Sequence, residues 1–203
     1  HLGRLTQRVG ATVPVLATVF SPLTIAAKLS RDAHRRHLKE TPEKVLAGLE
    51  LITDVTCAFV REAIGRGCAG MFFALQEATQ AAFSPAEYAR FGEPFDRRVI
   101  SAADAAGAWF NVLHIHGESI LFEQLARYPI TSLNWHIGET PPTIAEYRAG
   151  GGSRPIVGGL IRGNLTRRDR DGVAADLRRS LAESGERGLL IAPACVIRHP
   201  VDE

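Results

Sequence analysis

Two histidines separated by one residue, His114 and His116, lie in a short hydrophobic run that predicts a β-strand. Alternate residues of a strand point to the same face, so both imidazoles should leave it on one side, roughly 6.5–7 Å apart at Cα. This spacing suits joint ligation of one metal ion, because zinc lies about 2 Å from each ligating nitrogen. Cys195 follows a later hydrophobic run. Two imidazoles and one thiolate with an open fourth position are typical of catalytic zinc.

These three residues also have a plainer interpretation. A His-x-His pair on a buried strand is often only packed or hydrogen-bonded, and a Cys at a strand end often serves as a small buried hydrophobe. The other two cysteines, Cys57 inside a predicted helix and Cys68 before a predicted strand, are interpreted as core. Residue types and spacing alone leave both interpretations open.

Further polar side chains follow predicted strands. Arg162 and Asn164 come after a glycine-containing strand end, where the planar guanidinium of an arginine can bind a carboxylate or phosphate through two hydrogen bonds. We predict that both residues shape a catalytic pocket; for Arg162 the alternative is a surface ion pair. Gln76 and Glu77, after another strand, either face the same pocket or cap a loop. The segment Asn134-Trp135-His136 ends a further strand.

Six short hydrophobic runs predict the strands 13–20, 70–74, 110–114, 132–135, 155–160 and 188–192. None alternates between apolar and polar residues, which is typical of strands covered on both faces. Between them, a 3.6-residue periodicity predicts the helices 41–64, 84–106, 119–127, 143–148 and 171–183. This alternation predicts a parallel sheet with helices outside. The carboxyl ends of its strands then meet at one edge, where chemistry collects in such folds.

The composition is that of an ordinary globular domain: 203 residues, 45% hydrophobic and 23% charged, with a net charge of +2. This charge offers no electrostatic case for nucleic acid. No hydrophobic run approaches the roughly 20 residues of a membrane span, and no secretory signal is recognisable. Three widely spaced cysteines are not a disulfide framework. We therefore expect a reduced, cytoplasmic protein with neither nucleic-acid nor membrane partners.

Six motifs follow one another along the chain: Pro22-Leu23-Thr24, Phe72-Phe73, Ser84-Pro85-x-x-Tyr88-x-x-Phe91-x-x-Pro94, Leu113-His114-Ile115-His116-Gly117, Gly163-Asn164-Leu165 and Gly188-Leu189-Leu190-Ile191-Ala192-Pro193-Ala194-Cys195-Val196. In this order they resemble the uroporphyrinogen decarboxylase superfamily. It includes the decarboxylases of haem biosynthesis and the zinc-dependent corrinoid methyltransferases. The resemblance runs from about Pro14 to Pro200.

The resemblance implies a (β/α)8 barrel of the TIM type, of which this chain supplies about six parallel strands, the third to the eighth. We expect residues 1–203 to form a single domain, the C-terminal part of such a barrel. The first two strands would lie upstream of His1, which opens the sequence without Met and already within an amphipathic stretch. Six parallel strands cannot close an eight-stranded barrel, so two free edges are expected.

The sequence departs from the decarboxylase pattern at two places. Lys28 aligns near a tyrosine of the decarboxylases, and Ala192-Pro193-Ala194-Cys195 replaces their final Gly-His-Gly. That ending resembles the methyltransferases, which hold zinc through a His-x-Cys pair and a Cys on the last strand. Here the pair is His114-x-His116, so an imidazole replaces one thiolate and the site carries less negative charge.

The resemblance therefore implies a zinc-dependent, methyltransferase-like enzyme with His114, His116 and Cys195 as metal ligands. Its substrate would be a corrinoid or a thiol, with a corrinoid protein as partner and a homodimer as its assembly. One alternative is a cofactor-free uroporphyrinogen decarboxylase of porphyrin and haem biosynthesis, a carboxy-lyase acting on a tetrapyrrole. Another is a non-catalytic, tetrapyrrole-binding homologue. Metal content and porphyrinogen turnover would separate the three.

Overall fold

The computed structural model describes residues 1–185 and 187–197, and its centre is one parallel sheet. The sheet order follows the chain order: β1 (Leu16–Phe20), β2 (Gly70–Leu75), β3 (Val112–Ile115), β4 (Ser132–Trp135), β5 (Ile156–Leu160) and β6 (Leu189–Pro193). Each strand pairs in parallel with the next. Within the described residues β1 and β6 do not pair, so the sheet is open. The prediction of an α/β fold with six parallel strands is confirmed.

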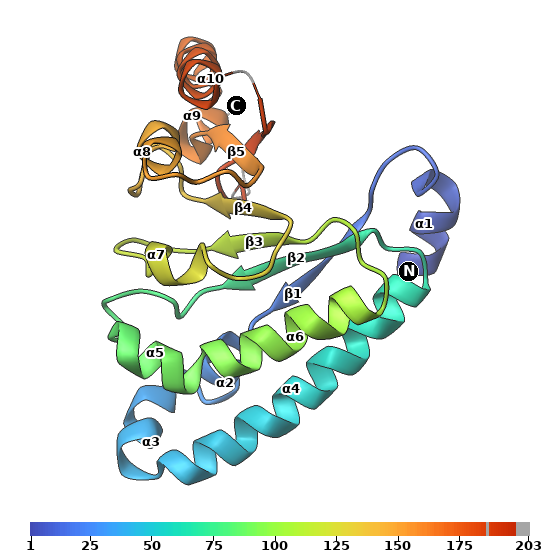
Figure 1. Cartoon of the computed structure of the whole chain (residues 1–203), viewed down its shortest axis with the longest axis vertical. Coiled ribbons are helices and arrows are strands. Elements are labelled where there is room, and N and C mark those ends of the chain that lie inside the picture. Colours follow the sequence, from blue (N-terminus) through green and yellow to red (C-terminus); the bar gives the residue numbers. More distant parts are fainter. Residues whose placement is uncertain (186, 198–203) are drawn as a thin grey trace.

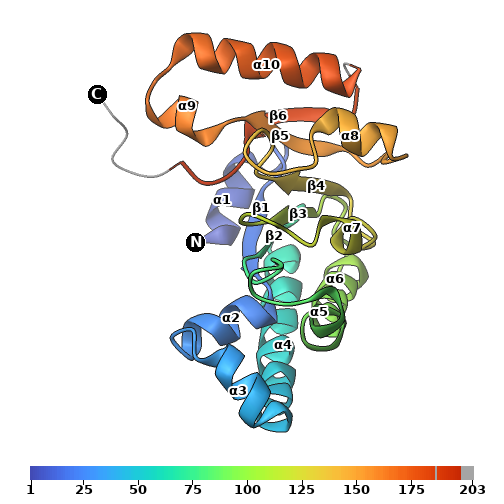
Figure 2. The same cartoon turned by 90° about the vertical axis from the view of Figure 1, so that its left-hand side faces the viewer.

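Helices connect these strands. They are α1 (Leu2–Val9), α2 (Pro22–Leu29), α3 (His34–Glu40), α4 (Pro42–Gly65), α5 (Pro85–Phe91), α6 (Glu93–Ala105), α7 (Phe122–Leu125), α8 (Ile144–Ala149), α9 (Arg162–Thr166) and α10 (Arg170–Ser184). Figure 1 shows α4 and α6 side by side along β1–β3. Figure 2 shows α8 and α10 against the β5–β6 end of the sheet. The core lies between these helices and the sheet, and both Cys57 and Cys68 are buried in it, as predicted.

The predicted helix 84–106 is two helices, α5 and α6, that meet at Gly92. Its start is as expected: the Ser84 hydroxyl accepts a hydrogen bond from the Glu87 amide, and the Glu87 carboxylate accepts one from the Ser84 amide. The break follows from Pro94, which lacks the N–H that a continuous helix would use at that position. Periodicity alone does not reveal this interruption.

Four helices were not predicted: α1, α2, α3 and α9. Of these, α2 had a readable signal, because Ser21 caps it by accepting a hydrogen bond from the Thr24 amide and Pro22 occupies the first turn. The prediction of a helix over 119–127 is wrong for most of that range, in which only the short helix α7 forms. Ser119 has a φ of 48°, which a right-handed helix does not admit.

Some apolar side chains remain exposed on the edge strand β6 and on α4. Leu190 and Ile191 of β6 are 48% and 41% exposed, and Leu51, Val55 and Phe59 form an exposed stripe along α4. Contiguous apolar surface of this kind marks places where further protein can pack. No helix within residues 1–185 and 187–197 combines the length and the apolar character needed to cross a membrane.

Candidate metal centre at the carboxyl edge of the sheet

Four side chains that can ligate a metal meet at the carboxyl ends of the strands. His114 lies near the end of β3 and His116 just after it, His136 follows β4, and Cys195 follows β6. Each offers one donor atom, and the four donors lie within 4.8 Å of one another. The parallel sheet brings together all three residues that the sequence predicted as ligands, because strand ends of one polarity share an edge. His136 is a fourth.

The distances between donor atoms match those of a tetrahedral site. Cys195 Sγ lies 3.5 Å from His116 Nδ1 and 3.7 Å from His114 Nε2. His116 Nδ1 lies 3.4 Å from His114 Nε2 and 3.2 Å from His136 Nε2. Bonds of the usual zinc lengths in a tetrahedron separate neighbouring ligands by about 3.3–3.6 Å. The donors can therefore surround one ion with little movement.

Asn134 determines the protonation of His114. Its amide Nδ2 donates a hydrogen bond to the Val157 carbonyl at 2.5 Å, so its Oδ1 faces His114. An amide oxygen can only accept, so His114 Nδ1 must carry the proton in this contact. The other ring nitrogen, Nε2, is then left with a lone pair directed at the centre. This is the arrangement that a metal-ligating histidine requires.

His136 has a carboxylate behind it. Its Nδ1 lies 4.0 Å from Glu139 Oε2, and the same oxygen lies 3.6 Å from Arg162 Nε. A carboxylate on the outer nitrogen of a ligating histidine orients the ring and increases its basicity. Arg162, predicted as a pocket residue, thus reaches the centre through Glu139, and its side chain forms an ion pair rather than meeting the donors.

Burial keeps two histidines of the centre, His114 and His136, neutral. It lowers the pKa of His114 to about 4, against the hydrogen bond that His114 donates to Asn134, which raises it. It also lowers the pKa of His136 to about 4, with a further lowering from the charges of His116 and His114. At neutral pH both rings are therefore uncharged, which is the form that binds a metal ion.

Asn164, the other predicted pocket residue, is engaged elsewhere. Its Nδ2 donates to Asp176 Oδ2 at 2.9 Å, and its Oδ1 accepts from Arg167 Nη2 at 2.9 Å. Asp176 is buried on α10 and also accepts a hydrogen bond from the Ile161 amide. Asn164 therefore ties α9 to α10, and the structure does not bring it to the four donor residues.

A cavity of about 630 Å³ opens beside the centre. Its lining comprises Thr18, Phe20, Phe72, Ala74, Gln76, His114, His116, Asn134, Val157, Ala192, Pro193, Cys195, Val196 and Ile197. The Phe72 ring stacks on His114 with centroids 5.2 Å apart and an angle of 25° between the planes. A molecule in this cavity would therefore contact donor residues on one side and apolar side chains on the other.

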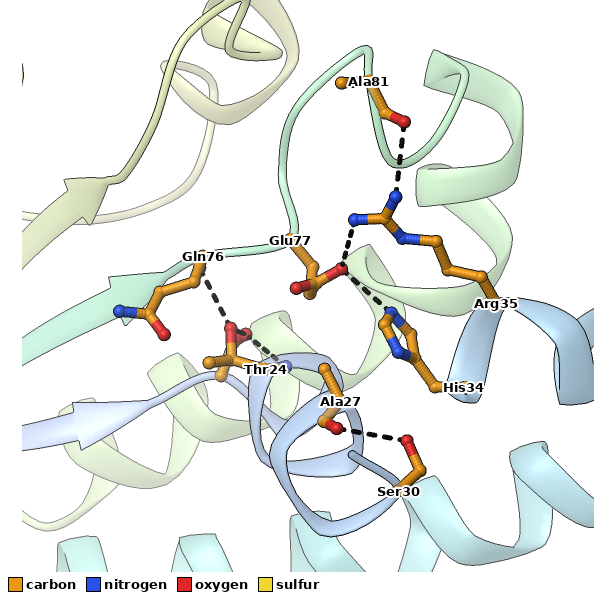
Figure 3. Close-up of polar contacts among 9 residues, drawn as sticks. Thr24, Ala27, Ser30, His34, Arg35, Gln76, Glu77 and Ala81 are labelled. Carbon is orange, nitrogen blue, oxygen red and sulfur yellow. Dashed lines mark hydrogen bonds and ion pairs between the residues drawn. The ribbon is translucent and has the colours of Figure 1, made fainter. Parts of the chain in front are cut away.

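The structure places Gln76 and Glu77 differently: one faces the cavity and the other holds a loop. Gln76 lines the cavity, whereas Glu77 lies 2.9 Å from His34 Nε2 and 3.5 Å from Arg35 Nη2, and Figure 3 shows the two side chains pointing to opposite sides. Burial would raise the pKa of Glu77, but the hydrogen bond from His34 and the charges of His34 and Arg35 outweigh it and hold this pKa below its usual value. Glu77 thus anchors α3 to the loop after β2.

The sequence signal for His136 is its spacing from Asn134. His136 stands two residues after Asn134, so an extended segment presents both on one face. Asn134 is paired in register with His114. A residue at position 136 therefore faces the same side of the sheet as the histidine pair, one strand further along.

The fold and the four donors define a protein class: an open, barrel-type α/β sheet with a candidate metal centre at its carboxyl edge. The chain belongs to the uroporphyrinogen decarboxylase (URO-D) family, whose sequence profile matches residues 2–202. Its structure is similar to that of a methyltransferase from Methanosarcina mazei, with a TM-score of 0.77 and 16% sequence identity. No curated protein matches the chain in sequence.

The structural similarity covers 99% of this chain and 58% of the methyltransferase chain. The chain therefore spans less than two thirds of that protein. The family predicted from the sequence motifs is confirmed by the match over residues 2–202, and the barrel-type fold is confirmed by the structural similarity.

Proposed function

We propose that this chain binds one zinc ion through His114 Nε2, His116 Nδ1 and Cys195 Sγ, with His136 Nε2 in the fourth position until a substrate takes it, and serves a methyltransferase-like enzyme acting on a thiol or corrinoid substrate. One observation carries the proposal: four donor atoms from three strand ends lie within 4.8 Å. Imidazole nitrogens and a thiolate suit zinc, whereas carboxylates would suit magnesium or calcium. The donor set thus fits the metal.

Zinc in such a site supplies a Lewis acid that lowers the pKa of a thiol or of water. The protein's own residues prepare the site. Asn134 holds the proton on the outer nitrogen of His114, and Glu139 lies behind His136. The apolar side of the cavity, formed by residues such as Phe20 and Phe72, excludes water from a bound substrate.

A second candidate function is favoured by His136. Four protein donors make a closed set, and closed sets are typical of structural zinc sites, whereas catalytic sites keep a position open. The centre would then join the ends of β3, β4 and β6 in a non-catalytic homologue. In this case, removing the ion with a chelator would strongly lower the midpoint of thermal unfolding. The metal-containing protein would not bind a thiol.

Metal analysis tests the proposal directly. Protein purified without chelator should contain about one zinc per chain, and His116→Ala or Cys195→Ala should lose most of it, because a site rarely survives loss of a central donor. His37→Ala on α3 is the matched control and should keep the metal. Zinc-free protein after expression in zinc-supplemented medium would overturn the proposal. The decarboxylase alternative would then be tested by porphyrinogen turnover.

A further inference from the structure

A second cavity, of about 490 Å³, lies between α2, α3 and α4, three helices that pack against one another. No described residue lines both this cavity and the one beside the metal centre. Its apolar wall is formed by Ala26, Leu29, Val45, Leu49 and Ile52. The exposed apolar stripe of α4 described above does not line it. The cavity therefore lies on another face of α4 than the surface where further protein can pack.

His34 of α3 places a ring nitrogen without a partner at the wall of this cavity. The side chain is 2% exposed, and its Nε2 lies 2.9 Å from Glu77 Oε2. Within the described part of the chain, Nδ1 has no hydrogen-bond partner. Figure 3 shows Glu77 on one side of the ring and Ser30 on the other, and of these two only Ser30 lines the cavity. The unpaired nitrogen thus lies on the cavity side of the ring.

Glu77 determines which nitrogen of His34 carries the proton. Burial raises the pKa of Glu77, but the contacts with His34 and Arg35 outweigh burial and hold it below its usual value. Glu77 is therefore a carboxylate at neutral pH and can only accept a hydrogen bond. Nε2 of His34 is then the donor, and in the neutral ring Nδ1 presents a lone pair. A buried acceptor without a donor is unfavourable, so a molecule that brings an O–H group would gain from pairing with it.

Gly48 leaves room for such a molecule. It lies inside α4, where glycine is less favourable than alanine, and it lines the cavity. A Cβ placed on Gly48 would meet no atom of the described chain within 4 Å. The helix backbone itself therefore forms part of the wall, beside the apolar side chains of Leu49 and Ile52.

We propose that this cavity binds a small, largely apolar alcohol, whose hydroxyl donates to His34 Nδ1 while its hydrocarbon part contacts the apolar wall. Nδ1 has no accessible surface in the structure, so a side chain at the wall must turn aside as the hydroxyl enters. Ser30 is the side chain expected to move, because it is half-buried and its Oγ donates to the Ala27 carbonyl at 3.1 Å. The site is separate from the proposed zinc centre and does not depend on it.

A pair of isomers tests this inference. 1-Octanol and 1-methoxyheptane have the same atoms, but only the first has an O–H group. Isothermal titration calorimetry at pH 8, which favours neutral imidazole, should give an affinity at least fivefold higher for 1-octanol. Without an acceptor the ether would bind as well or better, because burial of an unpaired hydroxyl is unfavourable. Equal or tighter binding of the ether, or no binding of either isomer, would overturn the inference.

Octanoate separates the proposed contact from a charge effect. The exposed Lys44 also lines the cavity, and its ammonium would attract a carboxylate. Octanoate has no hydrogen-bond donor at pH 8, so it should bind at least fivefold more weakly than 1-octanol. Tighter binding of octanoate would show that Lys44, and not His34 Nδ1, selects the ligand, and would overturn the inference.

Three variants locate the site. His34→Leu should abolish the preference for 1-octanol over 1-methoxyheptane. Should this variant fail to fold, Gly48→Leu decides, because it fills the cavity from a position with room for a side chain and should weaken 1-octanol binding at least tenfold. Gly65→Leu, at the exposed end of α4 where a Cβ also meets nothing, is the matched control and should bind like the natural protein. A preference that survives in His34→Leu, unchanged binding in Gly48→Leu, or an equal loss in Gly65→Leu would overturn the inference.

Discussion

Asn134 and His114 face each other across β4 and β3, with the Asn134 oxygen on the outer nitrogen of the imidazole. The orientation of the amide is fixed from the other side, because its Nδ2 donates to the Val157 carbonyl of β5. Three neighbouring strands thus share one hydrogen-bonded chain that ends at His114, whose Nε2 faces the other donor atoms.

This relationship predicts different behaviour for two substitutions of Asn134. Asn134→Asp keeps an acceptor for His114 Nδ1 and should keep the zinc affinity within a few-fold of the natural protein. Asn134→Leu removes the acceptor and should weaken zinc binding about 10–100-fold, which is the usual effect of losing such a partner. Competition with a chromophoric chelator measures both affinities. Equal zinc affinities in the two variants would show that the acceptor does not matter.

The second prediction concerns His136. If it is a ligand, His136→Ala should weaken zinc binding by a similar factor or more, and X-ray absorption of the zinc-loaded variant should show one imidazole fewer. Glu139→Gln keeps the size of the neighbouring side chain but removes its charge. Glu139→Gln should also weaken zinc binding, but by less than His136→Ala. An unchanged zinc environment in His136→Ala would exclude His136 from the centre.

The third prediction concerns Asp96, a fully buried residue of α6 that accepts hydrogen bonds from Tyr88 at 2.8 Å and Tyr128 at 3.1 Å. Burial raises the pKa of Asp96 to about 7, against both hydrogen bonds. An aspartate in an unfolded chain titrates near pH 3.9. Between these values the folded state binds the extra proton, so this residue's contribution to the free energy of unfolding falls as the pH rises.

Asp96→Asn removes this titration. From pH 4 to pH 8, the free energy of unfolding of the natural protein should fall relative to that of Asp96→Asn. The fall should be at most about 4 kcal/mol, which corresponds to three pKa units. Urea unfolding followed by circular dichroism measures it. Asp54→Asn, an exposed position, is the control and should show no comparable trend. A constant difference across this range would refute the raised pKa.

The fourth prediction concerns Glu77, whose contacts with His34 and Arg35 lower its pKa. A lowered carboxyl pKa stabilises the fold above the unfolded value, and this contribution is lost as the pH falls through the folded value. Glu77→Gln should therefore lower the free energy of unfolding by about 1–3 kcal/mol at pH 7. The deficit should shrink below about pH 4. Glu123→Gln at an exposed position is the control, and a deficit independent of pH would contradict this account.

Much of the fold could be predicted because hydrophobic runs, helix periodicity and capping residues are local features. Errors arose where a local feature was overridden or overlooked. The strand expected at 13–20 begins only at Leu16, after Pro14, which has no N–H for the ladder. The helix expected from Ser119 is shortened by that residue's left-handed backbone.

Some residues of the candidate site could likewise be predicted from the sequence, and others could not. His114, His116 and Cys195 could be predicted together because parallel strands end at one edge. The position of Asn164 could not, because its amide is held by Asp176 and Arg167 through contacts that only the folded chain reveals. The role of Glu139 between His136 and Arg162 depends on tertiary structure in the same sense.

The order of the sheet has a consequence for synthesis of the chain on the ribosome. Each described strand after β1 pairs with the strand made just before it, so a newly emerging strand finds its neighbour already in place. Cys195 lies directly after β6, the last of them. The imidazoles of β3 and β4 can therefore assemble early, but the thiolate joins them only when the final strand has docked. If the centre binds zinc as proposed, tight zinc uptake during translation would accordingly mark the docking of β6.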